Sequence, residues 1–312
     1  MRLTRWLTVI FMFCSLTAMA AWPEKPVRIV VPYPPGGTTD ILTRLLAQKL
    51  SDSWKQPVLV DNRPGGAAMI GSDLVAKSPA DGYTLLSTGA GPHAINVSLF
   101  SKIPYDPLKD FSSISLLSVN PLLMVVPAQL PVNSVAEYIT WVKANPSQAN
   151  YCSIGAGSPS HLAAELFKSM TGLSLTHVPY SGDAPAITDL LGGSTQAIFI
   201  PLTALIPQIQ GGALRGVAMF SGARFATLPD LPTAAEQGTD LVATGWFALV
   251  GPAKLPPPIV ATLNREVNAI IGTPEGQKQL AQFGALSGGG PSERLPALLA
   301  SELDRKSTRL IS

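Results

Sequence analysis

The stretch that decides the fold reads IVVPYPPGGTTD and runs from Ile29 to Asp40. The β-branched run Val27–Val31 predicts a strand, because branched side chains pack well on a pleated surface. Apolar residues then recur at helical spacing, which predicts a helix that starts at Thr39 or Asp40. A strand that leads directly into a helix is the unit from which α/β folds are built.

The turn between this strand and this helix is suited to exposing the backbone. Gly36 and Gly37 can take φ > 0 and would let a ligand approach the chain closely. The next three residues, Thr38–Asp40, are good N-caps and would leave amide groups pointing outward. We therefore expect this helix N-terminus to attract anions.

The first residues have the pattern of an export signal. Arg2 and Arg5 precede an apolar run, Trp6–Leu16, and small residues follow up to Ala20. The run is too short for a membrane span, which needs about 20 residues. We expect residues 1–20 to be a secretory signal peptide, cleaved after Ala20, so that a soluble protein is exported.

Charge is scarce and balanced in this chain. Charged residues make up 13% of the sequence, against about 25% in typical soluble proteins. Without Arg2 and Arg5, the 22 basic residues fall by two and equal the 20 acidic residues, so no basic field favours nucleic acid or an anionic membrane. Cys152 alone remains after cleavage, so no disulfide can form within the chain, which fits a bacterial periplasm.

Strands and helices alternate along the chain, which predicts a mostly parallel sheet. A capping box that begins at Ser134 predicts a helix that carries Tyr138 and Trp141 inward. Further strands and helices are predicted at Val58–Val60, Ile70–Lys77, Tyr83–Ser87, Tyr151–Ile154 and His161–Met170.

Two apolar strands, Leu122–Val126 and Phe247–Val250, are expected to cross between two domains. Residues 21–121 and 245–312 would then form domain 1, and residues 122–244 would form domain 2. Two stretches of the sequence are also similar to each other: VPYPPGGTTDILTRLL at Val31–Leu46 and VPYSGDAPAITDLL at Val178–Leu191. Each domain would thus place a glycine turn and a helix N-terminus at the carboxyl ends of its strands, where α/β folds bind ligands.

Catalytic motifs are missing from the sequence. It contains no His-Glu-x-x-His helix, no Gly-x-Ser-x-Gly elbow, no Walker loop and no Cys-x-x-Cys pair. His93, His161 and His177 lack the spacing of metal ligands and are interpreted as structural residues. Cys152 lies in a predicted strand and is interpreted as a small buried residue. We therefore expect no catalytic residue, no metal site and no cofactor.

The loop GAGSPS at Gly155–Ser160 follows a predicted strand and opens a helix. It is similar to a dinucleotide-binding fingerprint, but no acidic residue stands about 20 positions later to contact a ribose. We interpret it as another exposed helix N-terminus, where Ser158 and Ser160 act as N-caps, as ligand donors, or as both. Arg63 is expected in a salt bridge, with contact to an anionic ligand as the alternative, and Arg44 is expected to face solvent or pair with an acid.

Taken together, these motifs resemble the periplasmic binding proteins of tripartite tricarboxylate transporters, the Bug family. The resemblance covers about Trp22 to Leu303, and it is specific because the motifs are long and ordered. They are VVPYPPGGTTD, VDNRPGGAAMIGSDLVAKSPADGYTLL, HAINVSLFSKIPYDPLKDF, YCSIGAGSPSHLAAELFKSMTG, HVPYSGDAPAITDLLGG, LPDLPTAAEQG and the strand around Trp246.

The resemblance implies a type II periplasmic-binding-protein fold, in which two α/β domains joined by crossover strands close on a ligand in the cleft between them. It implies a monomeric periplasmic solute-binding protein that captures a small organic acid and delivers it to the membrane components of a tripartite tricarboxylate transporter. It also implies that loop amides, hydroxyls and ordered water hold the carboxylate, which suits a chain so poor in charge.

Carried over position by position, the resemblance places ligand contacts in four loops: Tyr33–Asp40, Thr88–His93, Gly155–His161 and Tyr180–Ala184. One further position follows Phe199. The predicted ligand-binding residues are Tyr33, Pro35, Gly36, Gly37, Thr38, Asp40, Thr88, Gly89, Ala90, His93, Gly155, Ala156, Ser158, Ser160, His161, Tyr180, Gly182, Asp183, Ala184 and Ile200.

The chain departs from the family pattern in three places. Ile200 stands where many relatives have an aspartate, which puts a polar contact there in doubt. The end, Arg305–Ser312, lacks the family's helical ending. Asp183 stands where relatives have a small or hydroxyl residue. It is expected either to cap its own helix or to face the cleft, where it would favour a ligand that carries an ammonium or a hydroxyl donor.

Two alternatives to a transport receptor stay open at this point: an exported α/β hydrolase-like enzyme that acts on small carboxylates, and a ligand sensor that feeds a signalling system. The enzyme would need a base close to a nucleophile, and no spacing in the sequence supplies one. A transcription-factor effector domain shares this architecture, but it is excluded by the signal peptide and by the missing DNA-binding helix-turn-helix.

Overall fold

The computed structural model describes residues 22–310, with side chains through Leu303. The predicted signal peptide at residues 1–20 lies outside the described residues. The strands are β1 (Val27–Val31), β2 (Val58–Asn62), β3 (Thr84–Gly89), β4 (Phe111–Pro127), β5 (Asn150–Ser153), β6 (Thr176–Pro179), β7 (Ile198–Pro201), β8 (Leu214–Met219), β9 (Thr244–Pro252) and β10 (Leu286–Ser287). The α-helices are α1 (Thr38–Trp54), α2 (Met69–Ala76), α3 (Asn96–Leu99), α4 (Val135–Ala144), α5 (Pro159–Thr171), α6 (Asp183–Leu191), α7 (Ile206–Gln210), α8 (Pro257–Ile271), α9 (Pro274–Gln282) and α10 (Arg294–Leu310).

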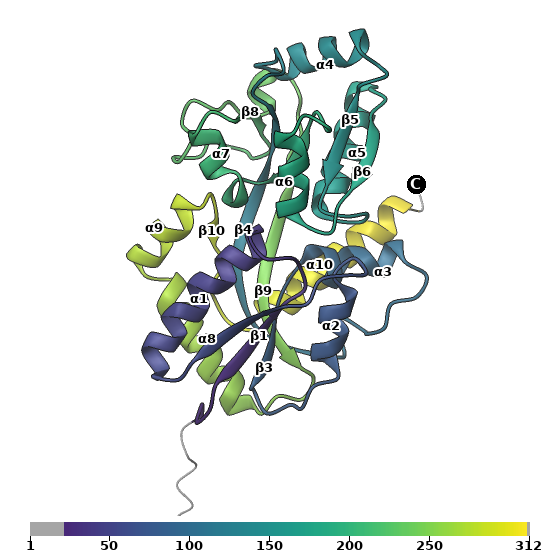
Figure 1. Ribbon diagram of the computed structural model, residues 1–312. Helices are drawn as coiled ribbons and strands as arrows, with labels where there is room; N and C mark the ends of the chain where they lie inside the picture. Colours follow the sequence, from purple (N-terminus) through teal and green to yellow (C-terminus); the bar gives the residue numbers. More distant parts are fainter. Residues whose placement is uncertain (1–21, 311–312) are drawn as a thin grey trace, which may run out of the picture.

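The strands form one continuous sheet in the order β2-β1-β3-β9-β4-β7-β5-β6, and β8 and β10 also pair with β4. Pairs β1–β2, β1–β3, β5–β6 and β5–β7 are parallel, as the alternation of strands and helices predicts. The long strands β4 and β9 run antiparallel to each other through the middle of the molecule (Figure 1). The predicted α/β class is therefore confirmed.

The partners of β4 change halfway along the strand. From Phe111 to Pro121 it pairs with β9, and from Leu122 onward it pairs with β7 and β8. We call β1–β3, β9 and β10, with the helices packed on them, the first lobe, and β5–β8 with α4–α7 the second lobe. The strand β4 belongs to both.

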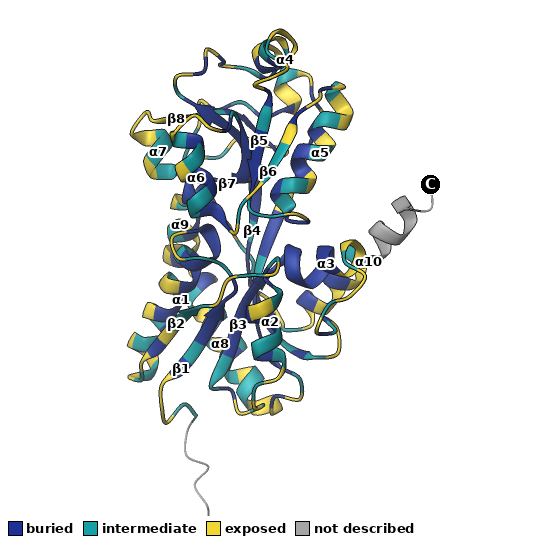
Figure 2. Ribbon diagram, turned by 45° about the vertical axis from the view of Figure 1, so that its right-hand side comes forward, coloured by how far each residue is buried: buried dark blue, intermediate teal, exposed yellow. Residues whose placement is uncertain are grey.

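Each lobe has its own apolar core on the two faces of its part of the sheet. Helices α1 and α8 cover one face of the first lobe, where Leu42, Leu46 and Leu50 pack against β1. In the second lobe, Tyr138, Phe167 and Phe199 share a cluster on one face. Figure 2 shows these strands as the buried centre of the molecule, with exposed residues on the outer sides of the helices.

The division into domains at residues 122 and 245 stays a prediction. Contacts of α9, which follows the second crossing, bear on where such a boundary would run. The hydroxyl of Thr203 donates to the carbonyl of Phe283 at 2.7 Å, and that of Thr227 donates to the carbonyl of Ala281 at 2.6 Å. The C-terminal end of α9 is therefore bound to the second lobe as well as to the first.

The helix α1 begins one residue earlier than the sequence predicts. Its N-cap is Gly37, which is extended at φ −86° and makes no side-chain cap bond. Asp40 does not cap forward, because its carboxylate accepts a hydrogen bond from the amide of Gly36 at 3.0 Å. The helix then proceeds because Leu42, Leu46 and Leu50, at i, i+4 and i+8, are all buried.

The predicted helical cap at Ser134 is confirmed. Its hydroxyl accepts from the amide of Glu137 at 3.2 Å, and the Glu137 carboxylate accepts from the amide of Asn133 at 2.6 Å. Tyr138 is fully buried as predicted, whereas Trp141 is only partly buried.

The C-terminal segment corrects one expectation. The backbone of α10 stays helical through Leu310, so the predicted departure from a helical ending is wrong for the described residues. Leu295 and Leu299 are buried against the strand that carries Trp246, which fixes the start of this helix on the sheet. The last two residues lie outside the described part.

We predict that Ser134→Ala lowers the free energy of unfolding by about 1 kcal/mol, because the amide of Glu137 loses its cap. Denaturant unfolding would measure the change, with Ser174→Ala as the control, since Ser174 is exposed and does not begin a helix. Equal stability of both variants would mean that the cap contributes nothing.

Candidate functional site

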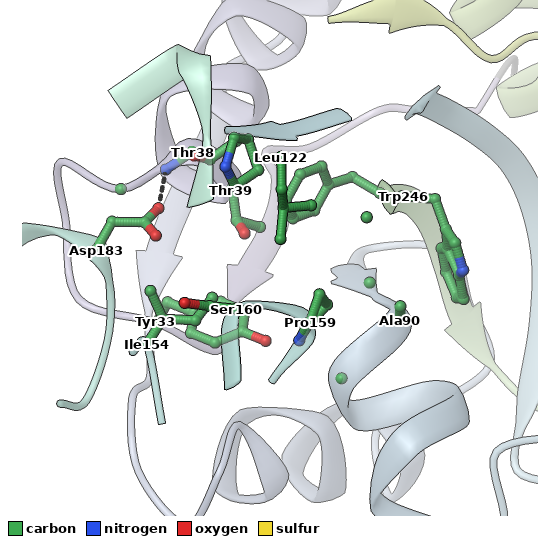
Figure 3. A pocket seen from close by; sticks show the side chains of 16 residues that line it. Tyr33, Thr38, Thr39, Ala90, Leu122, Ile154, Pro159, Ser160, Asp183 and Trp246 are labelled. Atoms are coloured by element: carbon green, nitrogen blue, oxygen red, sulfur yellow. Dashed lines mark hydrogen bonds between the residues drawn. The ribbon is translucent and has the colours of Figure 1, made fainter. Parts of the chain in front are cut away.

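A pocket lies between the two lobes, at the carboxyl end of β1, beside the middle of β4 and the start of β9. Its inner space is small, about 30 Å³. The residues that line it come from both lobes and are Tyr33, Gly37, Thr38, Thr39, Gly89, Ala90, Gly91, Leu122, Ile154, Pro159, Ser160, Asp183, Pro201, Gly245, Trp246 and Phe247 (Figure 3). We call this space the inner pocket.

The glycine turn of the opening stretch is held from behind by Asp40. Its carboxylate accepts from the amide of Gly36 at 3.0 Å, from Arg44 Nε at 2.9 Å and from Asn62 Nδ2 at 2.9 Å. Burial raises the pKa of Asp40, but the hydrogen bonds from Arg44, Gly36 and Asn62 outweigh it and hold that pKa below its ordinary value. Arg44 is therefore paired with an acid, and the front of the turn is left to face the pocket.

The amide at the N-terminus of α1 already binds a carboxylate, and that carboxylate belongs to the protein. Thr38 N donates to Asp183 Oδ2 at 2.5 Å across the two lobes (Figure 3). Asp183 is 7% exposed, and burial raises the pKa of its carboxyl, against the lowering effect of the Thr38 amide. The anion at this helix N-terminus is therefore the carboxylate of Asp183.

Asp183 does not cap its own helix. The N-cap of α6 is Gly182, which makes no side-chain cap bond, and Asp183 is the first residue inside the helix. The reading of Asp183 as a cap is therefore wrong, because its carboxylate turns across the cleft to the other lobe.

The loops of the two lobes approach each other closely at this contact. Gly36 has φ +86°, as predicted, but Gly37 has φ −86°, so positive φ is not the reason for glycine at 37. A Cβ at Gly37 would lie 2.8 Å from Asp183 Oδ2, and a Cβ at Gly182 would lie 2.8 Å from Pro34 Cδ. Glycine at 37 and 182 is explained by the narrow gap between the lobes.

Several polar atoms of the inner pocket have no hydrogen-bond partner among the described residues. They are Thr38 Oγ1, Ser160 Oγ and Asp183 Oδ1, each on a residue less than one tenth exposed. Unpaired buried polar atoms cost free energy, so groups of this kind need an explanation. The pocket is otherwise apolar, with Ile154, Leu122 and Trp246 on its walls.

The charge of the inner pocket is unusual for a site that would take an acid. Among the described residues that line it there is no lysine, arginine or histidine, and Asp183 is the one acidic side chain. Desolvation by burial and the nearby Asp183 carboxylate raise the pKa of Tyr33, which keeps its hydroxyl protonated. The pocket therefore offers amides, hydroxyls and one carboxylate.

A second space of about 220 Å³ adjoins the inner pocket and shares Tyr33, Gly91 and Ile154 with it. We call it the outer compartment. Its other lining residues are Gly65, Gly66, Ala67, Ala68, Asn96, Phe100, Gly155, Ala156, Gly157, Ser158, Tyr180 and Ser181. It is bounded by the N-terminal loops of α2 and α5.

The predicted residues fall into three groups. Tyr33, Gly37, Thr38, Gly89, Ala90, Ser160 and Asp183 line the inner pocket. Gly155, Ala156, Ser158 and Tyr180 line the outer compartment, together with Tyr33. Neither space is lined by Pro35, Gly36, Asp40, Thr88, His93, His161, Gly182, Ala184 or Ile200.

The residues of the third group have other neighbours in the fold. Thr88 Oγ1 and His93 Nδ1 form a hydrogen bond of 2.7 Å in the buried interior, where burial lowers the pKa of His93 to about 3. Ile200 is fully buried in the second lobe, and Pro201 beside it reaches the inner pocket. Ala184 faces Gly36 across the cleft. Ligand contact by any of the predicted residues stays a prediction.

His161 and His177 stack at 4.3 Å between ring centroids, directly behind the loop that opens α5. The amide of Gly157 donates to His161 Nδ1 at 3.3 Å, and His177 Nε2 and Ser153 Oγ are 2.6 Å apart. Burial, and then the charge of His161, lower the pKa of His177 to about 4. The reading of these histidines as structural therefore agrees with the contacts that they make.

The other sequence interpretations can be placed as well. Ser158 caps α5, since its hydroxyl accepts from the amide of His161 at 3.2 Å. Arg63 pairs with Asp61 at 2.9 Å, as expected of a salt bridge. Cys152 is fully buried, and burial raises the pKa of its thiol to about 12.

Sequence reasoning predicted a crossing strand at Phe247–Val250, but it did not predict that this strand lines the inner pocket or that the loop before α2 lines the outer compartment. Gly245, Trp246 and Phe247 line the inner pocket because β9 passes through the middle of the molecule, and a Cβ at Gly89 would lie 2.7 Å from the Trp246 carbonyl. The glycine run in RPGGAAM, Arg63–Met69, is the sequence signal that points to the outer compartment, since its two glycines line that space.

Within residues 22–310, no helix is long and apolar enough to cross a membrane. In the same part of the chain, no group of histidine, cysteine, aspartate and glutamate side chains could hold a metal ion.

Comparison with known proteins gives consistent matches over both lobes. The profile of the tripartite tricarboxylate transporter family receptor matches residues 42–312. Protein BugT of Bordetella pertussis is 37% identical over 313 residues, 98% of this chain and 96% of that protein. A solved R. palustris structure with adipate has a TM-score of 0.90 at 38% identity and covers 92% of this chain and 96% of its own. The periplasmic binding protein BugD has a TM-score of 0.86 at 31% identity, with 91% and 96% covered.

The two glycines of the turn should differ in what they do when substituted. Gly37→Val should weaken ligand binding by about tenfold or more with little change in unfolding, because the new side chain meets Asp183 across the lobes. Gly36→Ala should cost about 1 kcal/mol of stability, because alanine resists φ +86° although space is free there. Calorimetric titration and denaturant melts of both variants would measure this. Loss of stability alone in Gly37→Val would make that residue a plain turn residue.

The stacked histidines predict an acid-sensitive fold. The folded pKa of His177 lies below its ordinary value, so the unfolded chain binds the proton first as pH falls from about 6.5 toward 4. Neutral His177 therefore stabilises the fold above about pH 6.5, and this stabilisation is lost as the pH falls from about 6.5 toward 4. His177→Gln should therefore lose less melting temperature between pH 7 and pH 4.5 than the natural chain does. An identical loss in both would show that other groups govern this range.

Proposed function

The chain belongs to the tripartite tricarboxylate transporter receptor family, and we propose that it captures a small carboxylate between its two lobes and delivers it to the membrane components of such a transporter. The type II periplasmic-binding-protein fold of its relatives provides the means, since two lobes joined by crossing strands can close on a ligand.

One observation carries the proposal. The inner pocket lies between the lobes at the N-terminus of α1, and the Thr38 amide there donates to a carboxylate, that of Asp183. Helix N-termini favour anions because their first amides are unpaired and the helix dipole is positive there. The unpartnered hydroxyls of Ser160 and Thr38 add donors that need no charge.

The relatives support a carboxylate as the ligand class. The R. palustris structure, at 38% identity, holds adipate. Adipate is a flexible acid with a carboxylate at each end. The small inner pocket and the larger outer compartment could likewise each receive one polar end of such a ligand.

We place the protein in the periplasm as a monomer that catalyses nothing. The arginine-led apolar leader supports export. A hydrolase finds little support, because the Ser160 hydroxyl has no partner among the described residues and so no base activates it. The same capture could feed a sensor, but no feature of the described residues favours that role.

We predict that a panel of mono-, di- and tricarboxylates and amino acids contains a tight ligand for protein that has been unfolded and refolded to remove any carried-over ligand. Bound at 100 times its dissociation constant, that ligand should stabilise the fold by about 2.7 kcal/mol, and X-ray scattering should show a more compact particle.

Ser160→Ala should weaken that binding by about tenfold, because it removes a buried donor of the inner pocket. The exposed Ser194→Ala serves as the matched control and should bind normally. Turnover of the ligand, or no binding by any acid of the panel, would contradict the proposed function.

A further inference from the structure

Asp183 is a buried carboxylate that uses only one of its two oxygens. Oδ2 accepts from the Thr38 amide at 2.5 Å, whereas Oδ1 accepts no hydrogen bond among the described residues. The residue is 7% exposed and lines the inner pocket, where Figure 3 shows it at one wall, facing Thr38. An ionised carboxylate can accept about four hydrogen bonds, so Oδ1 is open to a donor from the ligand.

No positive side chain among the described residues that line the pocket balances this carboxylate. The described lining residues of the inner pocket and the outer compartment include no lysine, arginine or histidine. Arg44, on the first lobe, is engaged by Asp40 and by Asn62, both at 2.9 Å, and it lies behind the glycine turn. An ionised Asp183 therefore receives no counter-charge from these residues.

A plain carboxylate would make this imbalance worse. It would bring a second negative charge into a space that is mostly apolar, where like charges are poorly screened. A ligand that also carries an ammonium group avoids the conflict, because the ammonium can donate to Asp183 Oδ1 while the Thr38 amide keeps Oδ2.

The sizes of the two spaces agree with this orientation. The inner pocket has about 30 Å³ of space, which suits one small head group. The outer compartment has about 220 Å³ and is bounded by the loop that opens α5, Gly155–Ser158. The N-terminus of that helix is suited to the ligand's carboxylate.

On the basis of the proposed function, we propose that Asp183 determines specificity by receiving the ammonium group of the ligand, so that the ligand class is carboxylates with a protonated amine, of the amino acid type. The ammonium would sit in the inner pocket, where Asp183 already occupies the Thr38 amide. The ligand's carboxylate would then lie at the N-terminus of α5 and not at that of α1.

Matched pairs of acids with and without the amine test this directly. Calorimetry on the ligand-stripped protein would compare 2-aminoadipate with adipate, aspartate with succinate, and leucine with 4-methylpentanoate. At least one amino acid should bind about tenfold or more tightly than its partner without the amine. In Asp183→Asn, which keeps an acceptor for the Thr38 amide but removes the charge, that ratio should fall to about one. The exposed Asp240→Asn is the matched control and should keep it.

The outcomes separate this inference from the proposed function. If plain acids bind as tightly as their amino partners, the inference is wrong while carboxylate capture stands, and Asp183 then holds a proton and donates it. If Asp183→Asn keeps the affinity ratio of the amino acid to its partner without the amine, another residue recognises the amine and the inference is wrong. If no acid of either kind binds, both proposals fail. Should Asp183→Asn not fold, the ratio measured on the natural chain still decides.

Discussion

The hydrogen bond from Thr38 N to Asp183 Oδ2 connects two segments that are 145 residues apart, and the geometry of the cleft follows from it. It requires the first lobe to present a free amide, which the start of α1 provides because Gly37 contributes no side-chain cap. It also requires the two loops to approach within contact distance. Glycine stands at 37 and at 182 because any side chain there would meet Asp183 or Pro34.

Support for this bond comes from outside the pocket. Asp40 binds the back of the glycine turn, and Arg44 and Asn62 bind Asp40, so the turn is held without any pocket-facing group being used. In the second lobe, the stacked His161 and His177 hold the loop that opens α5 in a similar way. Asp40 and the two histidines position the loops from outside the inner pocket, and the hydroxyls of Thr38 and Ser160 have no partner among the described residues.

Much of the fold could be predicted because it depends on local pattern. The strand Val27–Val31 and the cap at Ser134 each depend on a few adjacent residues, and both are present as expected. The sequence left two alternatives for Asp183, a cap of its own helix or a side chain that faces the cleft. It could not predict the bond to Thr38, because this partner is far away in sequence. Thr88 and His93 are a similar case: loop residues at a strand end are expected to meet a ligand, yet these two bond to each other in the interior.

The scarcity of charged residues in this chain extends to the cleft, where Asp183 is the one acidic or basic side chain among the described residues of the inner pocket. A site that held acids by arginine or lysine would pay a large desolvation cost on closing and would need those charges neutralised when empty. Amides at a helix N-terminus attract an anion with partial charges only, so they can be exposed and covered repeatedly at little cost. A single buried carboxylate is conspicuous in such a neutral site. Because Asp183 is the one acidic or basic side chain among the described residues of this lining, we propose that it has the greatest influence on which small acid the cleft accepts.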